Sequence, residues 1–197
     1  MSILSDDFID EVRNIQYKNL AAELLKRLIE GKIKLMARKQ LVESKKFSEM
    51  LEKALNRYTN QAITNIEIIE ELIKMAKDME SSMKRGEDLG LSEDELAFYD
   101  ALCVNDAAVK IMGDDILKKI AHDLSESIRK NITIDWKLKE SVRARMRTEI
   151  KKLLRKYGYP PDQQENAVKT VMEQAELLCE NESYVIDENY GLAMVAE

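Results

Sequence analysis

Apolar residues recur at steps of three and four along the first part of the chain, which is the spacing of one helix face. Between Asp6 and Glu30 this spacing predicts an amphipathic helix, with Ser5 or Asp6 as its cap and Gly31 as its end. A short second helix is expected over 33–42. The apolar positions of the first helix are Phe8, Val12, Ile15, Leu20, Leu24, Leu25 and Leu28.

The same period continues without a break over 46–85, and it predicts one long helix there. A restart within this segment is the alternative, because Thr64 and Glu67 have the spacing of a capping box. The uninterrupted period favours the single helix. Gly86 and Gly90 are expected to end the segment.

Shorter helices are predicted after Gly90. The stretch Ser92-Glu93-Asp94-Glu95 follows a glycine and has the pattern of a capping box, so a helix should begin there. Asn105 is expected to cap the next helix, and Gly113 to separate it from a third that begins at Asp114 or Asp115.

The segment 131–136, NITIDW, breaks the helical period, and its alternating β-branched residues favour an extended segment or a very short strand. A helix over 138–157 and a last helix after Pro161 follow, whereas the residues from Asn181 onward show no period. The predicted fold is all-α, with at most that one extended segment. We expect long amphipathic helices, arranged as a hairpin, over 1–88, a compact helical lobe over 89–182 and an acidic tail over 183–197.

Composition supports helices, since the chain is 45% hydrophobic and 35% charged and holds only six Gly and two Pro. Its net charge of −6 is uneven, because seven acids and no base follow Lys169. The rest of the chain therefore has 31 bases against 30 acids, or +1. Bulk charge does not predict nucleic-acid binding, so any DNA contact must come from a local patch.

Cysteine usage and hydropathy predict a cytoplasmic protein with no membrane contact. Cys103 and Cys179 match no C-x-x-C spacing and are expected to be reduced thiols. No apolar run approaches the roughly 18 residues of a membrane span, and no signal peptide is expected at the start.

The usual catalytic patterns are missing from the sequence. It contains no G-x-x-x-x-G-K-[ST], no G-x-G-x-x-G and no G-x-S-x-G, and His122 is the single histidine. Four-helix di-metal sites use Glu-x-x-His motifs, which are also absent. We therefore predict no catalytic, cofactor-binding or metal-binding residue and no enzyme activity for the isolated chain.

The helix over 138–157 is basic, with seven Lys/Arg between Arg143 and Lys156. On a helical wheel its apolar residues share one arc of about 160°, and the bases spread over the remainder. This distribution favours a solvated face, with glutamates of the last helix and the tail as candidate partners within the chain. The alternative is contact with a partner or with phosphates, and the candidate phosphate contacts are Arg143, Arg147 and Lys151.

The stretch YGYPPD predicts a rigid corner after this helix. Gly158 can adopt a positive φ and close the helix, Pro160 disfavours helix at Tyr159, and Pro161 suits the first turn of the next helix. Such a corner is either a clasp in the core or a docking point, because exposed aromatics anchor interfaces. The candidate partner contacts are Trp136, Tyr157, Tyr159, Pro160 and Pro161.

Several stretches together resemble one family, the C-terminal helical domain of the restriction (motor) subunit of type I restriction–modification enzymes. The resemblance covers roughly 6–178. It is carried by ELAFYDAL (95–102), RKNITIDW (129–136), LRKYGYPPD (154–162) and VMEQAELL (171–178), with ELLKRL and SKKFSEMLE before them.

This resemblance implies that the chain is a fragment or domain of a longer subunit with a nuclease domain and two helicase-like lobes, to which ATP and Mg would bind. It implies assembly with methyltransferase and specificity subunits, and contact with the helicase-like lobes of the same subunit. Recognition of the DNA site would lie in another subunit. No catalytic residue carries over, because the family's motifs fall outside this span. DNA contact and pairing with a second copy stay open.

Overall fold

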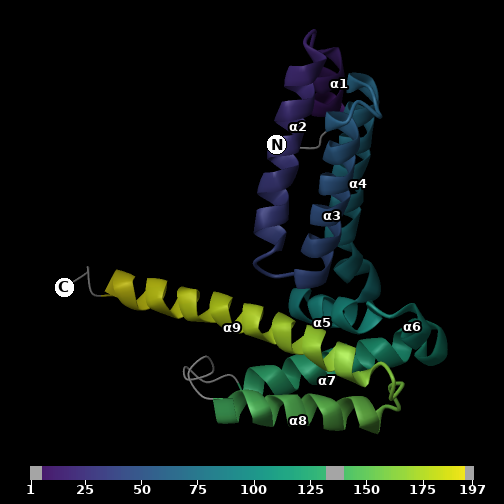
Figure 1. Cartoon of the computed structure of the whole chain (residues 1–197). Helices are drawn as coiled ribbons and strands as arrows, with labels where there is room; N and C mark the ends of the chain where they lie inside the picture. The colour runs from purple at the N-terminus through teal and green to yellow at the C-terminus, as the bar shows by residue number, and fades with distance from the viewer. Residues whose placement is uncertain (1–5, 132–139, 194–197) are drawn as a thin grey trace. The chain divides into compact units, whose positions relative to one another are not determined.

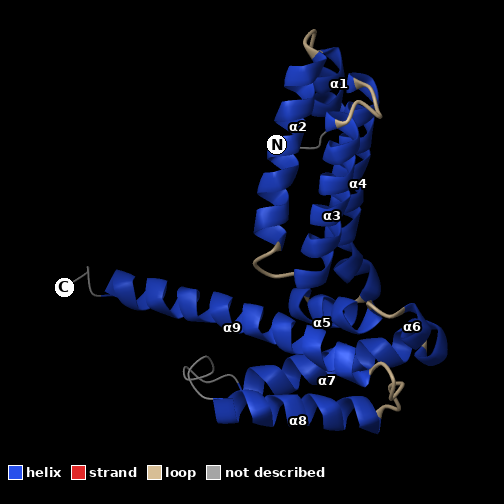
Figure 2. Ribbon diagram, viewed as in Figure 1, coloured by secondary structure: helices blue, strands red, loops and turns tan. Residues whose placement is uncertain are grey.

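The computed structural model describes residues 6–131 and 140–193, and within them residues 6–7, 131 and 181–193 by their backbone alone. These residues form nine helices and no strand (Figures 1 and 2), which confirms the predicted all-α fold. The extended segment expected near 131–136 lies, after Asn131, outside the described residues. The helices are α1 (Asp6–Asn14), α2 (Lys18–Met36), α3 (Leu41–Thr59), α4 (Asn65–Leu89), α5 (Glu93–Cys103), α6 (Asp106–Met112), α7 (Asp114–Asn131), α8 (Glu140–Lys156) and α9 (Gln164–Ala193).

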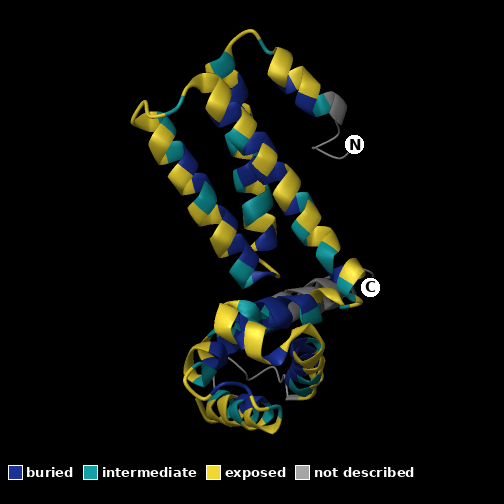
Figure 3. Cartoon of the chain, turned by 90° about the vertical axis from the view of Figure 1, so that its right-hand side faces the viewer, coloured by how far each residue is buried: buried dark blue, intermediate teal, exposed yellow. Residues whose placement is uncertain are grey.

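The chain divides into two compact units, each with its own apolar core. In both, buried and exposed positions alternate along the helices (Figure 3). The core of unit 1 comes from α1 to α4, and that of unit 2 mainly from α5 to α9. Unit 1 comprises Met1–Ala37 and Glu43–Asp88, and unit 2 comprises Arg38–Val42 and Leu89–Glu197.

The first predicted helix is two helices, α1 and α2, and the prediction of its end is wrong. Gly31 lies inside α2, which continues to Met36. A Cβ at Gly31 would meet nothing within 4 Å, so glycine there costs only its helix propensity, about 1 kcal/mol. Leu20 and Leu24, expected on the packed face, are 59% and 38% exposed.

The single helix predicted over 46–85 is also wrong, because α3 and α4 are separate. The amide of Gln61 donates to the Tyr58 carbonyl at 3.0 Å, and the amide of Ala62 to the Arg57 carbonyl at 2.8 Å. This pair of bonds is a Schellman motif. Gln61 adopts a left-handed φ of 57° where glycine is usual, so the sequence gives no signal of the helix end.

The alternative restart is confirmed at the start of α4. The amide of Thr64 donates to the Glu67 carboxylate at 2.7 Å, and the amide of Glu67 to the Thr64 hydroxyl at 3.3 Å. These reciprocal bonds form a capping box. Gly86 lies inside α4, which ends at Leu89, and Gly90 follows with φ 68°. Of the two glycines expected to end the segment, Gly90 alone does so.

The helix caps predicted in unit 2 are confirmed. Ser92 and Glu95 form a complete capping box at α5. The side chain of Asn105 accepts the amide of Ala107 at 2.9 Å and caps α6. Gly113 follows α6 with φ 73° and precedes α7. Local hydrogen bonding therefore sets these boundaries, as the residue types indicate.

Helices α7 and α9 pack against α5, and α8 packs against both α7 and α9. Three buried residues of α8, Met146, Ile150 and Leu154, supply its side of this core. The backbone of α9 remains helical to Ala193, so the lack of helix expected after Asn181 is corrected. The part of unit 2 formed by α7, α8 and α9 positions both candidate surfaces described below.

Candidate docking surface

The YGYPPD corner joins α8 to α9 and is closed by a second Schellman motif. The amide of Gly158 donates to the Arg155 carbonyl at 3.0 Å, and that of Tyr159 to the Leu154 carbonyl at 2.9 Å. Gly158 has φ 73°, which confirms that it closes the helix. The backbone at this corner is therefore held in one geometry.

Tyr159 is the buried residue of the corner. Its side chain is 2% exposed, and its hydroxyl donates to the Leu102 carbonyl in α5 at 2.9 Å. Burial, together with the neighbouring Cys103, raises the pKa of Tyr159 to about 12, so the hydroxyl stays a donor at neutral pH. Pro160 is also buried. For these two residues the contacts favour a clasp in the core.

Tyr157 and Pro161 are the parts of the corner that solvent reaches. The half-buried Tyr157 donates its hydroxyl to Asp123 on α7 at 2.8 Å, and the Lys156 ammonium lies 3.3 Å from the same carboxylate. Burial alone would raise the pKa of Asp123, but these two contacts outweigh it and lower that pKa. Pro161 is exposed in the turn before α9 rather than in its first helical turn. Trp136 lies outside the described residues.

A groove runs between α8 and α9, and the three predicted phosphate contacts lie along its α8 wall. Arg143, Arg147 and Lys151 are four residues apart, so they follow one another at about 6 Å along the helix. The groove has a volume of about 490 Å³. Its α9 wall carries Glu165, Lys169, Glu173 and Glu176, beside the buried Val168 and Met172.

One ion pair crosses this groove. The guanidinium of Arg143 lies 2.5 Å from the Glu176 carboxylate, which confirms at this position that the last helix pairs with the basic helix. Among the described residues Arg147, Lys151 and Lys169 have no ion pair. The lining holds four bases and three acids, so it has both signs of charge rather than a strong positive field.

A buried glutamine that the helical pattern did not single out holds segment 38–42 within unit 2. Gln174 on α9 is 0% exposed, and its amide nitrogen donates to the Lys39 carbonyl at 2.7 Å. Its amide oxygen accepts the Leu41 amide at 2.9 Å. The available signal was a polar residue beside the apolar Ala175, on the packed face of the predicted last helix.

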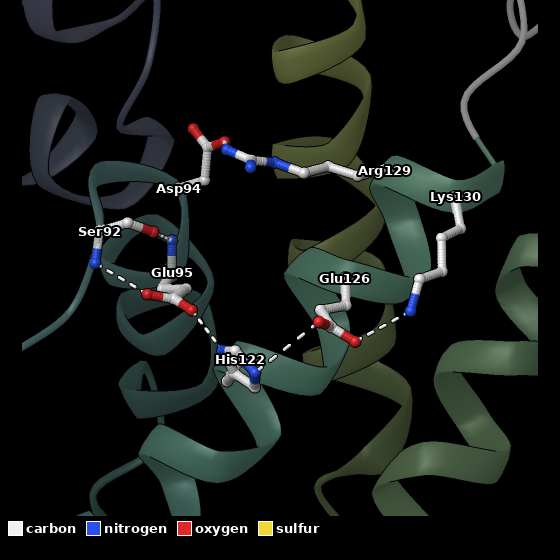
Figure 4. A network of polar contacts seen from close by, with 7 residues as sticks. All are labelled: Ser92, Asp94, Glu95, His122, Glu126, Arg129 and Lys130. Carbon is white, nitrogen blue, oxygen red and sulfur yellow. Dashed lines mark hydrogen bonds and ion pairs between the residues drawn. The ribbon is translucent and has the colours of Figure 1, made fainter.

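A polar network around His122 joins α5 to α7 (Figure 4). The His122 Nδ1 lies 2.5 Å from the Glu95 carboxylate, which also completes the α5 capping box. The His122 Nε2 lies 4.0 Å from Glu126, one turn along the same helix. Arg129 pairs with Asp94 on α5. These contacts tie the start of α5 to the middle and end of α7.

The hydrogen bond and charge of Glu95 raise the pKa of His122, which is 58% exposed. Burial acts to raise the pKa of Glu95, but bonds from His122 and Ser92 outweigh it and lower that pKa. Across the described residues no group of His, Cys, Asp and Glu is arranged to hold a metal ion. Nor is any helix in that part of the chain long and apolar enough to cross a membrane.

Comparison with known proteins identifies the family. A family model described as type I restriction enzyme HindI endonuclease subunit-like, C-terminal, matches residues 1–181. The chain is 43% identical over 181 residues to the HindI endonuclease subunit of Haemophilus influenzae, an alignment that covers 92% of this chain and 17% of the relative. It is 33% identical over 159 residues to a protein of Methanocaldococcus jannaschii named for the MjaIXP type I restriction enzyme endonuclease subunit, covering 80% of this chain and 15% of that relative.

The chain thus spans about one sixth of the length of these curated relatives. No solved structure matches it. The family model, the two relatives and the resemblance carried by YGYPPD and its companion stretches agree. The chain therefore belongs to the family of C-terminal regions of HindI-like type I restriction enzyme endonuclease subunits.

Proposed function

We propose that this chain is a non-catalytic docking domain that holds a type I restriction endonuclease subunit on its methyltransferase and specificity subunits. The observation that carries the proposal is the match over residues 1–181 to the C-terminal region of an endonuclease subunit. A subunit works in an assembly, and a helical unit with its own packed core suits a connecting role. We place that assembly in the cytoplasm, as the cysteine usage and hydropathy of the sequence predict.

Nuclease and ATP-driven motor activity, with ATP and Mg, belong in this proposal to other parts of the longer subunit, whose helicase-like lobes this region also contacts. The relatives' names describe endonuclease subunits of which this chain covers 15–17%. We therefore expect the isolated chain to hydrolyse no ATP. A phosphate-release assay on the purified chain, with and without DNA, checks this, and turnover above a buffer blank would contradict it.

The solvent-facing part of the Tyr-Pro corner is one candidate contact with the partner. Tyr157 and Pro161 reach solvent there, while Tyr159 and Pro160 set the shape from beneath. A half-buried aromatic beside an exposed proline presents a rigid apolar feature, which costs little conformational entropy on binding. Trp136, which precedes α8 in sequence, stays in the predicted set.

Co-purification tests the docking role. The tagged chain is expected to retain the assembled methyltransferase–specificity complex, and a variant with Tyr157→Ser and Pro161→Ser should retain less. Lys110→Ser, at an exposed position on α6, is the matched control and should behave as the wild type. Failure of the wild-type chain to retain the complex, together with normal assembly of a longer subunit lacking this region, contradicts the proposal.

A second candidate function is contact with DNA through α8, favoured by the alignment of Arg143, Arg147 and Lys151 along one groove wall. If all three bases meet phosphates, the slope of log affinity against log salt should be about −3. Replacing the three with Ala should remove that slope, whereas Arg145→Ala with Arg155→Ala, on the same helix outside the groove lining, should keep it. Absent or salt-independent binding rejects this function.

A further inference from the structure

The groove between α8 and α9 carries only bases on its α8 wall and mostly acids on its α9 wall. The α8 wall is wholly basic, through Arg143, Arg147 and Lys151. Three of the four charged residues on the α9 wall are acids. Such segregation means that any ligand in the groove meets cations on one side and mainly carboxylates on the other.

Some of the charged groups that line the groove have no ion pair among the described residues. Arg143 is already paired across the groove with Glu176, which closes that end. Arg147 and Lys169 are exposed, Lys151 is half-buried, and none of these three has an ion pair within the described part of the chain. Glu165, also exposed, likewise has none there. The unpaired groups therefore include cations from both walls and one carboxylate.

The acidic wall decides between the two kinds of macromolecule that could fill this groove. A nucleic-acid backbone presents only anionic phosphates, and phosphates in this groove would also meet the carboxylates of its α9 wall. A protein segment can carry both signs and satisfy both walls. Complementary potentials of this kind fix orientation and exclude wrong partners.

We propose that the α8–α9 groove is the docking site for a helix of the partner subunit, with its acidic side chains toward α8 and its basic side chains toward Glu165. The proposal rests on the docking function above and names the surface that performs it. The spacing supports a helical occupant, because Arg147 and Lys151 are one turn apart, and acids one turn apart on a second helix repeat at the same interval of about 6 Å.

Two opposite charge reversals test this assignment against DNA contact. The first variant combines Arg147→Glu with Lys151→Glu, and the second is Glu165→Lys. Affinity of the full chain for the assembled methyltransferase–specificity complex is measured by biolayer interferometry, and affinity for duplex DNA by fluorescence anisotropy. Circular dichroism and thermal melts establish that each variant is folded before its affinity is compared.

A two-signed protein partner predicts that both reversals weaken binding to the complex by at least about ten-fold, and that higher salt reduces the wild-type affinity. Matched controls should stay within about two-fold of the wild type. Arg145→Glu with Arg155→Glu reverses bases of α8 outside the groove lining. Glu140→Lys reverses an acid in the first turn of α8, as Glu165→Lys does in α9.

The remaining outcomes overturn the assignment in distinguishable ways. If the wild type binds the complex and both groove variants bind equally well, docking stands but this groove is not its site. If the basic-wall variant loses DNA affinity while the acidic-wall variant gains it, the groove contacts phosphates instead. If the folded wild-type chain does not bind the complex at all, the proposed function itself fails.

Discussion

Units 1 and 2 each end a helix with the same pair of backbone hydrogen bonds, but they use different residues to do so. In unit 2 the left-handed residue is Gly158, and in unit 1 it is Gln61. The residue after Gly158 is the buried Tyr159, which belongs to the core together with Leu154. The residue after Gln61 is the exposed Ala62.

The difference shows two ways to fix the same turn. At Gly158 the backbone conformation is intrinsically accessible, and a buried aromatic adds a tertiary contact that selects it. At Gln61 a side chain is forced into the left-handed region, and the capping box at Thr64 restarts the chain soon afterwards. The turn in unit 1 thus depends on local hydrogen bonds, and the turn in unit 2 on the core beneath it.

The largest expected effect comes from a change in one of the two cores. It tests whether each core is stable independently of the other. Phe47 and Phe98 are fully buried in units 1 and 2 respectively, so replacing either with Ala should cost about 3–5 kcal/mol. Hydrogen exchange read by mass spectrometry should show lost protection mainly in the unit that carries the change. Equal loss of protection in both units for either variant would show that the two cores are not independent in stability.

Next in size is the buried polar contact in unit 2. Gln174→Met leaves the Lys39 carbonyl and the Leu41 amide without their partner in the interior, which should cost about 2–4 kcal/mol in urea unfolding. Gln163→Met, at a half-buried turn position, serves as a control of the same chemistry and should cost less. A cost for Gln174→Met no greater than the control would show that water replaces the lost bonds.

Gly158 in unit 2 should be harder to replace than Gln61, which holds the same place in the turn of unit 1. Gly158→Ala places a Cβ in the left-handed region, where L residues are disfavoured by about 1–2 kcal/mol. A Cβ at this position meets no atom within 4 Å, so the expected loss comes from the backbone alone. Thermal unfolding measures it, and an unchanged midpoint would show that the corner relaxes to a different turn.

The reciprocal change in unit 1 should stabilise the protein. Gln61→Gly removes the strain at φ 57° but adds freedom to the unfolded chain, for a net gain of about 0.5–1 kcal/mol. Gln163→Gly, in the turn before α9 and without a positive φ, is the control and should be neutral or destabilising. A loss of stability for Gln61→Gly would mean that its side chain contributes more than the strain costs.

The smallest expected effect is a difference between the two capping boxes in how the free energy of unfolding depends on pH. The raised pKa of His122 gives stability that is fully present below pH 6.5 and lost as pH rises through its folded value. The lowered pKa of Glu95 gives stability that is present above pH 4.5 and lost as pH falls through its folded value. The His122–Glu95 contact should therefore stabilise the fold most between pH 4.5 and pH 6.5. His122→Gln should flatten the alkaline side of the plot of unfolding free energy against pH.

The Thr64–Glu67 box provides the contrast for this measurement. Its backbone bond lowers the pKa of Glu67, so the stability that this box contributes is lost at acid pH. No histidine takes part in this box. Glu67→Gln should therefore change stability above pH 4.5 and leave the alkaline side unaltered. Because His122 is exposed, solvent screening keeps its effect small. If stability still falls at alkaline pH in His122→Gln, another titratable group causes that fall.

Local chemistry in the sequence predicted unit 2 better than unit 1. Ser92 with Glu95, Asn105 and Gly158 each leave a residue-type signature at the position where a helix begins or ends. One error in unit 1 arises because apolar periodicity reports which positions repeat and not whether the chain reverses between them, and another arises because a glycine does not always end a helix. Gln61 hid a helix end, and Gly31 suggested one that does not exist.

The candidate surface was predicted in part. The bases Arg143, Arg147 and Lys151 were identified from the basic helix, and the structure places them along one groove wall. Which acids face them depends on how α9 packs on α8, which spacing within either helix does not encode. Gln174 was missed for the same reason, because its partners are backbone groups more than a hundred residues away in sequence.

Segment 38–42 has a practical consequence for dividing this protein into fragments. A cut before Leu89, at the sequence boundary between the units, would leave these five residues with the wrong piece. In the C-terminal fragment the amide of Gln174 would then have lost both of its backbone partners. Supplying 38–42 as a separate peptide should restore the fragment, which makes this segment a natural site for split-protein complementation.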